Sequence, residues 1–189
     1  MGKVVSLIKW LLVLIGAVTV YVVVLFWSNT QTKALDVYWN MGKTLVDTGD
    51  MAMSTIVRTP VPDDVSNEDV EEAMSSIATE LQIREVGKLP LSEQVELQTG
   101  EKQRFLKIFQ YCSPRTAMKM VDYSDAFAAY LPCRIALLED KQGKRWLYSL
   151  NMDMMIYGGK PLPDDLYELA VQVKDTITQI QEKGAKADF

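Results

Sequence analysis

Residues 105–150 decide the fold, and they read FLKIFQYCSPRTAMKMVDYSDAFAAYLPCRIALLEDKQGKRWLYSL. Runs rich in aromatic and aliphatic side chains predict strands over 105–111, 133–138 and 145–150. After the first strand, Ser113-Pro114 predicts a helix start, because serine caps a helix and proline fits its first position. The segment KQGK at 141–144 predicts a hairpin turn between the last two strands, with Gly143 suited to positive φ.

The flanking sequence completes the sheet and covers it. A short β-like run spans 54–61. Ser66 and Asp69 match a capping box, and the helix that follows repeats apolar residues with a 3.6-residue period at Val70, Ala73, Met74, Ile77 and Leu81. A strand, a short helix and a long final helix are predicted over 83–86, 92–97 and 163–184. This order predicts an α+β fold, in which a compact, mostly antiparallel sheet is packed with helices on one face.

Three motifs in the central stretch resemble a known bacterial family. They are Cys112-Ser113-Pro114, Leu131-Pro132-Cys133-Arg134, and the glycine hairpin that leads into an aromatic strand over 141–150. The pattern is similar to the family called domain of unknown function number 302, over about residues 52–184. The resemblance implies a compact α+β fold that is often dimeric. It implies no settled biochemical activity. A membrane anchor is expected in only some members of the family.

The N-terminal region contains an 18-residue segment without charge, Trp10–Trp27. As a helix this segment would be about 27 Å long, close to the hydrocarbon thickness of a bilayer. A tryptophan stands at each end, where amphipathic rings are common. The competing interpretation is a secretory signal peptide, but the sequence SNTQTKALD at 28–36 lacks an A-x-A-like cleavage site. We therefore expect an uncleaved transmembrane anchor.

Basic residues near the segment predict its orientation. Lys3 and Lys9 precede it, whereas Lys33 and Lys43 lie farther beyond it, and positive charge favours the cytoplasmic side. We expect an anchor, a stalk and a soluble α+β domain over residues 1–29, 30–50 and 51–189. The protein would then be a single-pass protein of a bacterial inner membrane, with its N-terminus in the cytoplasm and its domain in the periplasm.

Small and aromatic side chains near the membrane are candidates for contact with a partner. Gly16 would allow a second transmembrane helix to approach closely. Tyr38 and Trp39 on the stalk form an apolar surface that would rest on lipid head groups or on another protein. The expected partners are the bilayer together with other membrane-protein subunits or a second copy of this chain.

The composition excludes several classes of function. The chain has 189 residues, no histidine and a formal net charge of -5. Without histidine there is no Ser-His-Asp or Cys-His nucleophile and no histidine-ligated metal. The acidic balance argues against nucleic-acid binding, which needs a basic face. No catalytic constellation or cofactor motif stands out, so we expect a non-catalytic protein without a cofactor.

The only two cysteines, Cys112 and Cys133, fall at the same end of the sheet if their strands pair antiparallel. Three interpretations remain open for them. They are small buried side chains, an exported disulfide that closes a 20-residue loop, or a thiol site for metal or redox chemistry.

The 10 methionines suggest a second kind of site. Thioethers and thiolates are the soft ligands that select Cu(I), and the close-spaced candidates are Met118, Met120, Met152 and Met154. The competing explanation is packing, because methionine often fills gaps in a core.

Two functions from different classes follow from these observations. The first is a non-catalytic accessory or interaction subunit of a membrane protein assembly, which rests on the anchor, the aromatic stalk and the lack of catalytic groups. The second is a periplasmic protein that binds Cu(I) or a small ligand, which rests on the cysteines and methionines.

Overall fold

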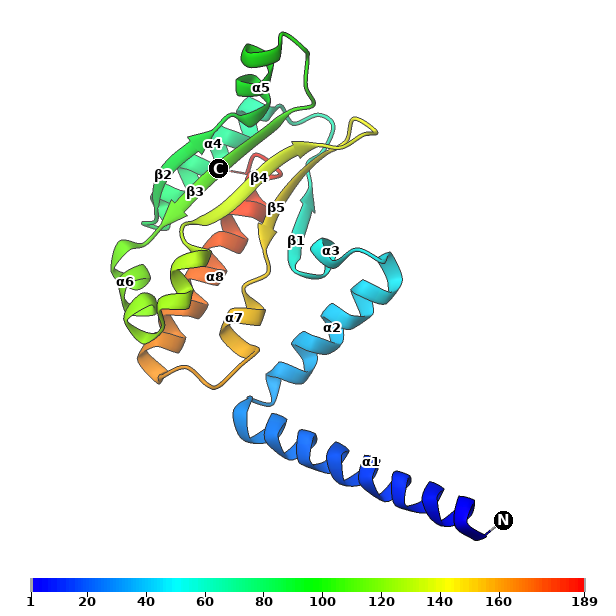
Figure 1. The fold of residues 1–189 in the computed structure, drawn as a ribbon. Coiled ribbons are helices and arrows are strands. Elements are labelled where there is room, and N and C mark those ends of the chain that lie inside the picture. Colours follow the sequence, from blue (N-terminus) through cyan, green and yellow to red (C-terminus); the bar gives the residue numbers. More distant parts are fainter. Residues whose placement is uncertain (1, 189) are drawn as a thin grey trace.

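The computed structural model describes residues 2–188 (Figure 1). Within this range the strands are β1 Ile56–Pro60, β2 Arg84–Leu89, β3 Leu106–Cys112, β4 Cys133–Glu139 and β5 Arg145–Leu150. The helices are α1 Gly2–Asn29, α2 Lys33–Thr48, α3 Met51–Ser54, α4 Asn67–Glu80, α5 Leu91–Thr99, α6 Pro114–Tyr123, α7 Asp153–Tyr157 and α8 Asp164–Gly184, with a 3₁₀ helix η1 at Asp125–Tyr130.

The strands form one five-stranded sheet in the order β1-β5-β4-β3-β2, and every neighbouring pair is antiparallel. A tight hairpin joins β4 to β5, as the sequence predicts. Gly143 in its turn has φ 79°, a conformation that favours glycine. The carboxylate of Asp140 accepts hydrogen bonds from the backbone N–H groups of Gln142 and Lys144, which fixes the turn. The predicted α+β class and antiparallel sheet are therefore confirmed.

Helices α4 and α8 cover the same face of the sheet (Figure 1). The apolar stripe predicted for the first of these helices is the side that α4 buries, with Leu81 partly buried at its end. Alternate residues of the three central strands, β3, β4 and β5, pack against the buried side of α4, because successive side chains of a strand point to opposite faces. These residues are fully buried at 0 % exposure: Phe109, Tyr111, Ile135, Leu137 and Leu147.

The predicted helix starts are confirmed with one difference in detail. Ser66 and Asp69 form a complete capping box at the start of α4. Pro114 occupies the first turn of α6, as predicted, but the side chain of Ser113 does not cap it. The Ser113 hydroxyl instead lies 3.2 Å from the hydroxyl of Thr116. The proline, with its fixed φ, therefore marks this helix start without a serine cap.

A second, smaller core lies beyond the end of the sheet. Ile156, Leu162, Leu166 and Ala170 form it, and Met120, Phe127 and Met152 pack against it. Helix α7, which contributes Ile156, is not among the predicted elements because five residues are too few for a helical period. Its Asp153 forms an ion pair with Lys174 of α8 and so fixes α7 to the long helix.

The stalk region is largely helical, but its helix α2 does not prolong α1. The chain turns at residues 30–32, and α2 packs against the domain beside α7 (Figure 1). Gln31 Nε2 donates to the Ile156 carbonyl at 2.8 Å, and the Tyr38 hydroxyl donates to the Gly158 carbonyl at 2.6 Å. Ala34 and Val37 are buried in the contact. These bonds make α2 a part of the folded body rather than a free stalk.

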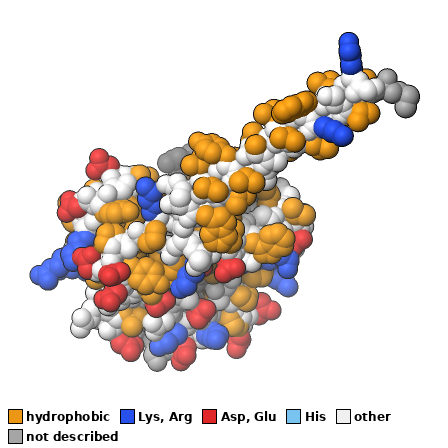
Figure 2. Space-filling view, turned by 90° about the horizontal axis from the view of Figure 1, so that it is seen from below, with side chains coloured by type: hydrophobic (Ala, Val, Ile, Leu, Met, Phe, Trp, Pro, Cys, Tyr) orange, Lys and Arg blue, Asp and Glu red, His pale blue; other side chains and the backbone are white. Residues whose placement is uncertain are grey.

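Helix α1 is long and apolar enough to cross a membrane. None of its most apolar window is buried against the rest of the chain. Figure 2 shows its hydrophobic side chains protruding from the domain, with further hydrophobic side chains gathered where it leaves the domain.

Candidate functional site: a sulfur-lined cavity at the end of the sheet

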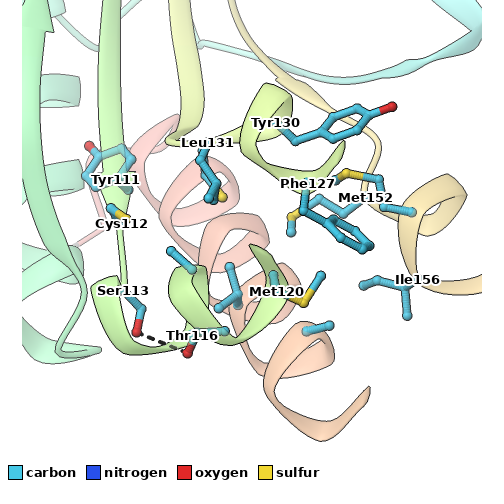
Figure 3. Close-up of a pocket in the computed structure, with 15 residues that line it drawn as sticks. Tyr111, Cys112, Ser113, Thr116, Met120, Phe127, Tyr130, Leu131, Met152 and Ile156 are labelled. Carbon is cyan, nitrogen blue, oxygen red and sulfur yellow. Dashed lines mark hydrogen bonds between the residues drawn. The ribbon is translucent and has the colours of Figure 1, made fainter. Parts of the chain in front are cut away.

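A cavity of about 50 Å³ lies between the main core and the second core (Figure 3). Its walls come from the end of β3, from α6 and η1, from the start of β4, from α7 and from α8. Among the described residues that line it, none is charged. Two of the three motifs that carry the family resemblance contribute to it, through Cys112 and Ser113 and through Leu131 and Cys133.

Five sulfur-bearing side chains line this cavity: Cys112, Cys133, Met120, Met152 and Met155. They come from β3, β4, α6 and the segment around α7, and three of them stand at the end of an element. Cys112 ends β3 and Cys133 begins β4, while Met152 is the residue before α7. In Figure 3, Tyr111 and Cys112 lie on the β3 side of the cavity and Met152 lies on the opposite side.

A second and more open cavity of about 210 Å³ adjoins the first. It lies along β4 and β5 and has Arg134 in its wall. The two cavities share Tyr130, Cys133, Met152 and Met155. We refer to Cys133, Met152 and Met155 as the sulfur triad. The triad lines both cavities, and both are open to the surface, so a small species could reach it without unfolding the domain.

The strand register explains how the two cysteines are arranged. Cys133 pairs with Tyr111 across β3 and β4, so these two side chains share the helix-covered face. Cys112 is the next residue along β3 and starts from the other face, because side chains alternate. Both cysteines are free thiols in the structure. The structure therefore supports the prediction that they lie at the same end of the sheet, and it gives no support to a disulfide between them.

Burial keeps both thiols protonated at neutral pH. It raises the pKa of the Cys112 thiol above its usual value. The pKa of Cys133 rises to about 11, first because of burial and then because of the neighbouring Cys112, and nearby Arg134 offsets this only in part. Reactive cysteines have the opposite property, a lowered pKa. These thiols are therefore poor nucleophiles on their own, and a bound cation would have to displace their protons.

The phenol of Tyr111 forms another part of the cavity wall. Its hydroxyl is buried and has no hydrogen-bond partner among the described residues. Burial is the main cause that raises its pKa well above the usual range, and the carboxylates of Glu85 and Glu71 add to the effect. The Tyr111 phenol therefore stays neutral at physiological pH.

Two of the four methionines proposed from the sequence line the cavity and two do not. Met120 and Met152 line it. Met118 lies on the outer side of α6 with 59 % of its surface exposed, and Met154 lines neither cavity described above. The helical turn of α6 and α7 explains the difference, because residues two positions apart on a helix point to different sides. Met155 joins the cavity instead.

The sequence pattern does not reveal Met155, Phe127 or Tyr130 as parts of one site. Phe127 and Tyr130 lie in η1, whose six residues carry no helical period. The available signal was the MDMM segment at 152–155, in which spacing alone does not tell which sulfur faces inward.

The predicted partner contacts lie on the surface of the chain. A side chain placed at Gly16 of α1 would meet nothing within 4 Å. Tyr38 and Trp39 of α2 are 43 % and 75 % exposed. These three residues are far along the chain from the cavity and do not contribute to it.

The set of groups in the cavity limits what it can hold. No group of three or more His, Cys, Asp or Glu side chains that could hold a metal occurs within residues 2–188. The polar oxygens of the wall are hydroxyls of serine, threonine and tyrosine, whereas hard cations prefer carboxylates and carbonyls. Thiols and thioethers dominate, and they are soft ligands.

Comparisons with known proteins agree with the fold. A structure described as an uncharacterized conserved DUF302 protein from Bacillus stearothermophilus superimposes with a TM-score of 0.53. It is 12 % identical, and the match covers 67 % of this chain and 95 % of that one, so it bears on the fold alone. No curated protein gave a significant match. The family model for DUF302, a domain of unknown function, matches residues 57–184. This range contains all the cavity-lining residues and more than half of the chain, and the protein therefore belongs to the DUF302 family.

Proposed function

We propose that this protein is a single-pass inner-membrane protein that binds Cu(I), without catalysis, in a periplasmic domain. Helix α1 would be the uncleaved anchor, and Lys3 and Lys9 before it favour an N-terminus in the cytoplasm. The DUF302 domain would then lie outside the cytoplasm and close to the membrane surface. The site would be the sulfur triad with Cys112 and Met120 beside it.

The observation that carries the proposal is the convergence of five sulfur side chains on one small cavity without a charged wall. Soft thiolate and thioether ligands select Cu(I) over the hard cations of the periplasm. The cavity, with a volume of about 50 Å³, has room for an ion, since a water-sized species needs only about 10–15 Å³ on the same measure. The wider cavity next to the triad provides an entry path.

The role assigned to each sulfur follows from its position. Cys133 would supply the anionic ligand, since it is the one cysteine that both cavities share. Met152, just before α7, and Met155 of α7 would complete a three-sulfur site. The ion pair between Asp153 and Lys174 attaches α7 to α8. The thioethers of Met152 and Met155 therefore lie on a segment with a fixed position.

The test is an anaerobic Cu(I) titration of the full chain in detergent or nanodiscs against a colorimetric Cu(I) chelator. We expect one Cu(I) per chain, held against the chelator. Cys133→Ala is expected to abolish this binding, and Met152→Leu with Met155→Leu to weaken it at least about tenfold, because soft ligands are lost.

A matched control uses the methionines that lie outside the cavity. Met118→Leu with Met154→Leu removes the same number of thioethers and keeps the triad. This control should bind as the wild type does. Equal weakening by both pairs, or no binding by the wild type, would exclude the site.

The second candidate function is an accessory subunit of a membrane assembly or of a homo-oligomer. It is favoured by the exposure of Gly16 on α1 and of Trp39 on α2. The test is recovery after mild detergent extraction of the wild type and of a chain whose residues 7–27 are replaced by poly-Leu. Loss of a stoichiometric partner from the altered chain would support this function, and unchanged recovery would show that α1 only tethers.

A further inference from the structure

An apolar stripe runs along the side of α2 that faces away from the domain. Leu35, Trp39, Gly42 and Val46 recur at helical spacing along it. Trp39 is 75 % exposed and Val46 is 85 % exposed, and a side chain placed at Gly42 would meet nothing within 4 Å. Lys43 and Asp47 flank the groove on this side. An exposed apolar stripe of this kind is typical of a surface that contacts a membrane or another protein.

The domain cannot cover the stripe, because it already occupies the opposite side of α2. Ala34 and Val37 are buried there, and Tyr38 donates to the Gly158 carbonyl. Lys33 lies over the ring of Tyr157, 4.7 Å from its centroid. These contacts fix the rotation of α2 about its own axis, so the apolar stripe faces away from the domain.

A contact between two aromatic rings fixes the orientation of α2 relative to α1. The ring centroids of Phe26 and Tyr38 are 6.1 Å apart. If α2 continued α1 as a straight helix, these residues would be separated by about 18 Å along the axis. Helix α2 therefore turns back beside the end of α1 instead of leading away from it.

The link between the two helices also keeps α2 close to the membrane. Only residues 30–32 separate α1 from α2, and three residues span at most about 10 Å. Phe26 and Trp27 end the apolar segment of α1 and would lie at the depth where the hydrocarbon meets the head groups. The first turns of α2 must therefore lie in the head-group region. Trp39 lies in these turns, and tryptophan is typical of the membrane–water interface.

From this geometry we propose that α2 lies in the outer interface of the bilayer, with Leu35, Trp39 and Val46 inserted among the lipid head groups and upper acyl chains. This inference rests on the proposed anchoring by α1. Figure 2, which views the molecule from below, shows hydrophobic side chains around the base of α1, where this surface would meet the bilayer. The domain would rest on α2 at a fixed height, with the sulfur triad held near the membrane.

The test uses the protein's own tryptophans, of which there are four. Three full-length chains each keep one of Trp27, Trp39 and Trp146 and carry Phe at the other tryptophan positions. Each is placed at one copy per phosphatidylcholine nanodisc, which excludes contact with a second copy. Fluorescence is quenched with lipids brominated either near the carbonyl end or near the methyl end of the acyl chain.

We expect Trp39 to be quenched at least about twofold more strongly by bromine near the carbonyl end, as for a side chain at shallow depth. Trp146 on the sheet should not be quenched by either lipid. Val46→Asp in the Trp39 chain should reduce the quenching, because placing a carboxylate among the upper acyl chains is costly. Val57→Asp, at another exposed valine, should leave it unchanged.

The quenching results distinguish the placement of α2 in the interface from the anchoring by α1. Quenching of Trp27 without quenching of Trp39 would retain the anchor and overturn the placement of α2. Absence of quenching at Trp27 would overturn both. If Trp39 is shielded from aqueous acrylamide in native membranes but not in nanodiscs, another protein covers the stripe, and the proposal is wrong.

Discussion

Cys133 lies opposite Tyr111 in the register of β3 and β4, and Cys112 follows Tyr111 by one residue. The two thiols therefore leave neighbouring strands from opposite faces, yet both reach one cavity because they stand at the ends of those strands. Because they start from opposite faces, the two cysteines occupy different parts of the cavity. Cys133 lies among the sulfurs of the triad, whereas Cys112 lies at the β3 edge of the cavity.

The first prediction concerns the redox state of this pair. Because the two thiols start from opposite faces, we expect Cys112 and Cys133 to remain reduced in the folded protein. Full-length protein is purified without reductant, unfolded in an alkylating reagent and weighed by mass spectrometry. Two alkyl groups per chain are expected, whereas an intact mass without alkylation would demonstrate the bridge.

The second prediction is a pH dependence of thiol reactivity. Burial raises the pKa of Cys133 to about 11, so the thiolate that reacts is scarce at neutral pH and increases about tenfold per pH unit below that value. In a Cys112→Ala chain, the alkylation rate should keep rising towards pH 11. The same chain in urea is the control, and its rate should level off above about pH 9. A native rate that also levels off there would show that the thiol is not buried.

The third prediction concerns the contact between α4 and α8. A side chain at Gly184 would clash with the Met74 Cγ atom, and Met74 is fully buried. Gly184→Ala is therefore expected to destabilise the domain by about 1–3 kcal/mol through overpacking. Gly159→Ala is the control, since nothing lies within 4 Å of that position. Thermal unfolding measures both, and an unchanged or raised Tm for Gly184→Ala would contradict the packing of these helices.

The fourth prediction concerns the attachment of α2 to the domain. Tyr38→Phe removes the hydrogen bond to the Gly158 carbonyl and should weaken the docking of α2 by about 1 kcal/mol. Hydrogen exchange of the α2 amides should become faster by about fivefold, while exchange in β3 and β4 stays the same. Tyr123→Phe is the control, because the Tyr123 ring is exposed on α6. Equal exchange in all three chains would show that α2 is held by other contacts.

The sequence predicts the sheet and its main helices well, because their signals are local. The capping box at Ser66, the proline at the start of α6 and the glycine in the β4–β5 turn each fix a boundary by backbone chemistry. The buried stripe of α4 follows from helical period alone. The family match over 57–184 agrees with the resemblance recognised in the cysteine and proline motifs.

The site could be predicted only in part, because it is assembled from short elements. Cys112, Cys133, Met120 and Met152 follow from residue type, but Met155 replaces Met154 through the rotation of a five-residue helix. The direction of α2 likewise depends on contacts between Tyr38 and residues more than a hundred positions later in the chain. Contacts of that separation leave no periodic trace in a single sequence.

X-ray absorption spectroscopy of the full chain loaded with one equivalent of Cu(I) tests the central claim most directly, because it counts and identifies the atoms bound to the metal. The account predicts a first shell of sulfur only, with about three sulfurs from Cys133, Met152 and Met155. Met155→Leu should remove one of these, and Met154→Leu should change nothing. A shell that contains nitrogen or oxygen, or one that both variants leave intact, would contradict the assignment of the cavity as a Cu(I) site.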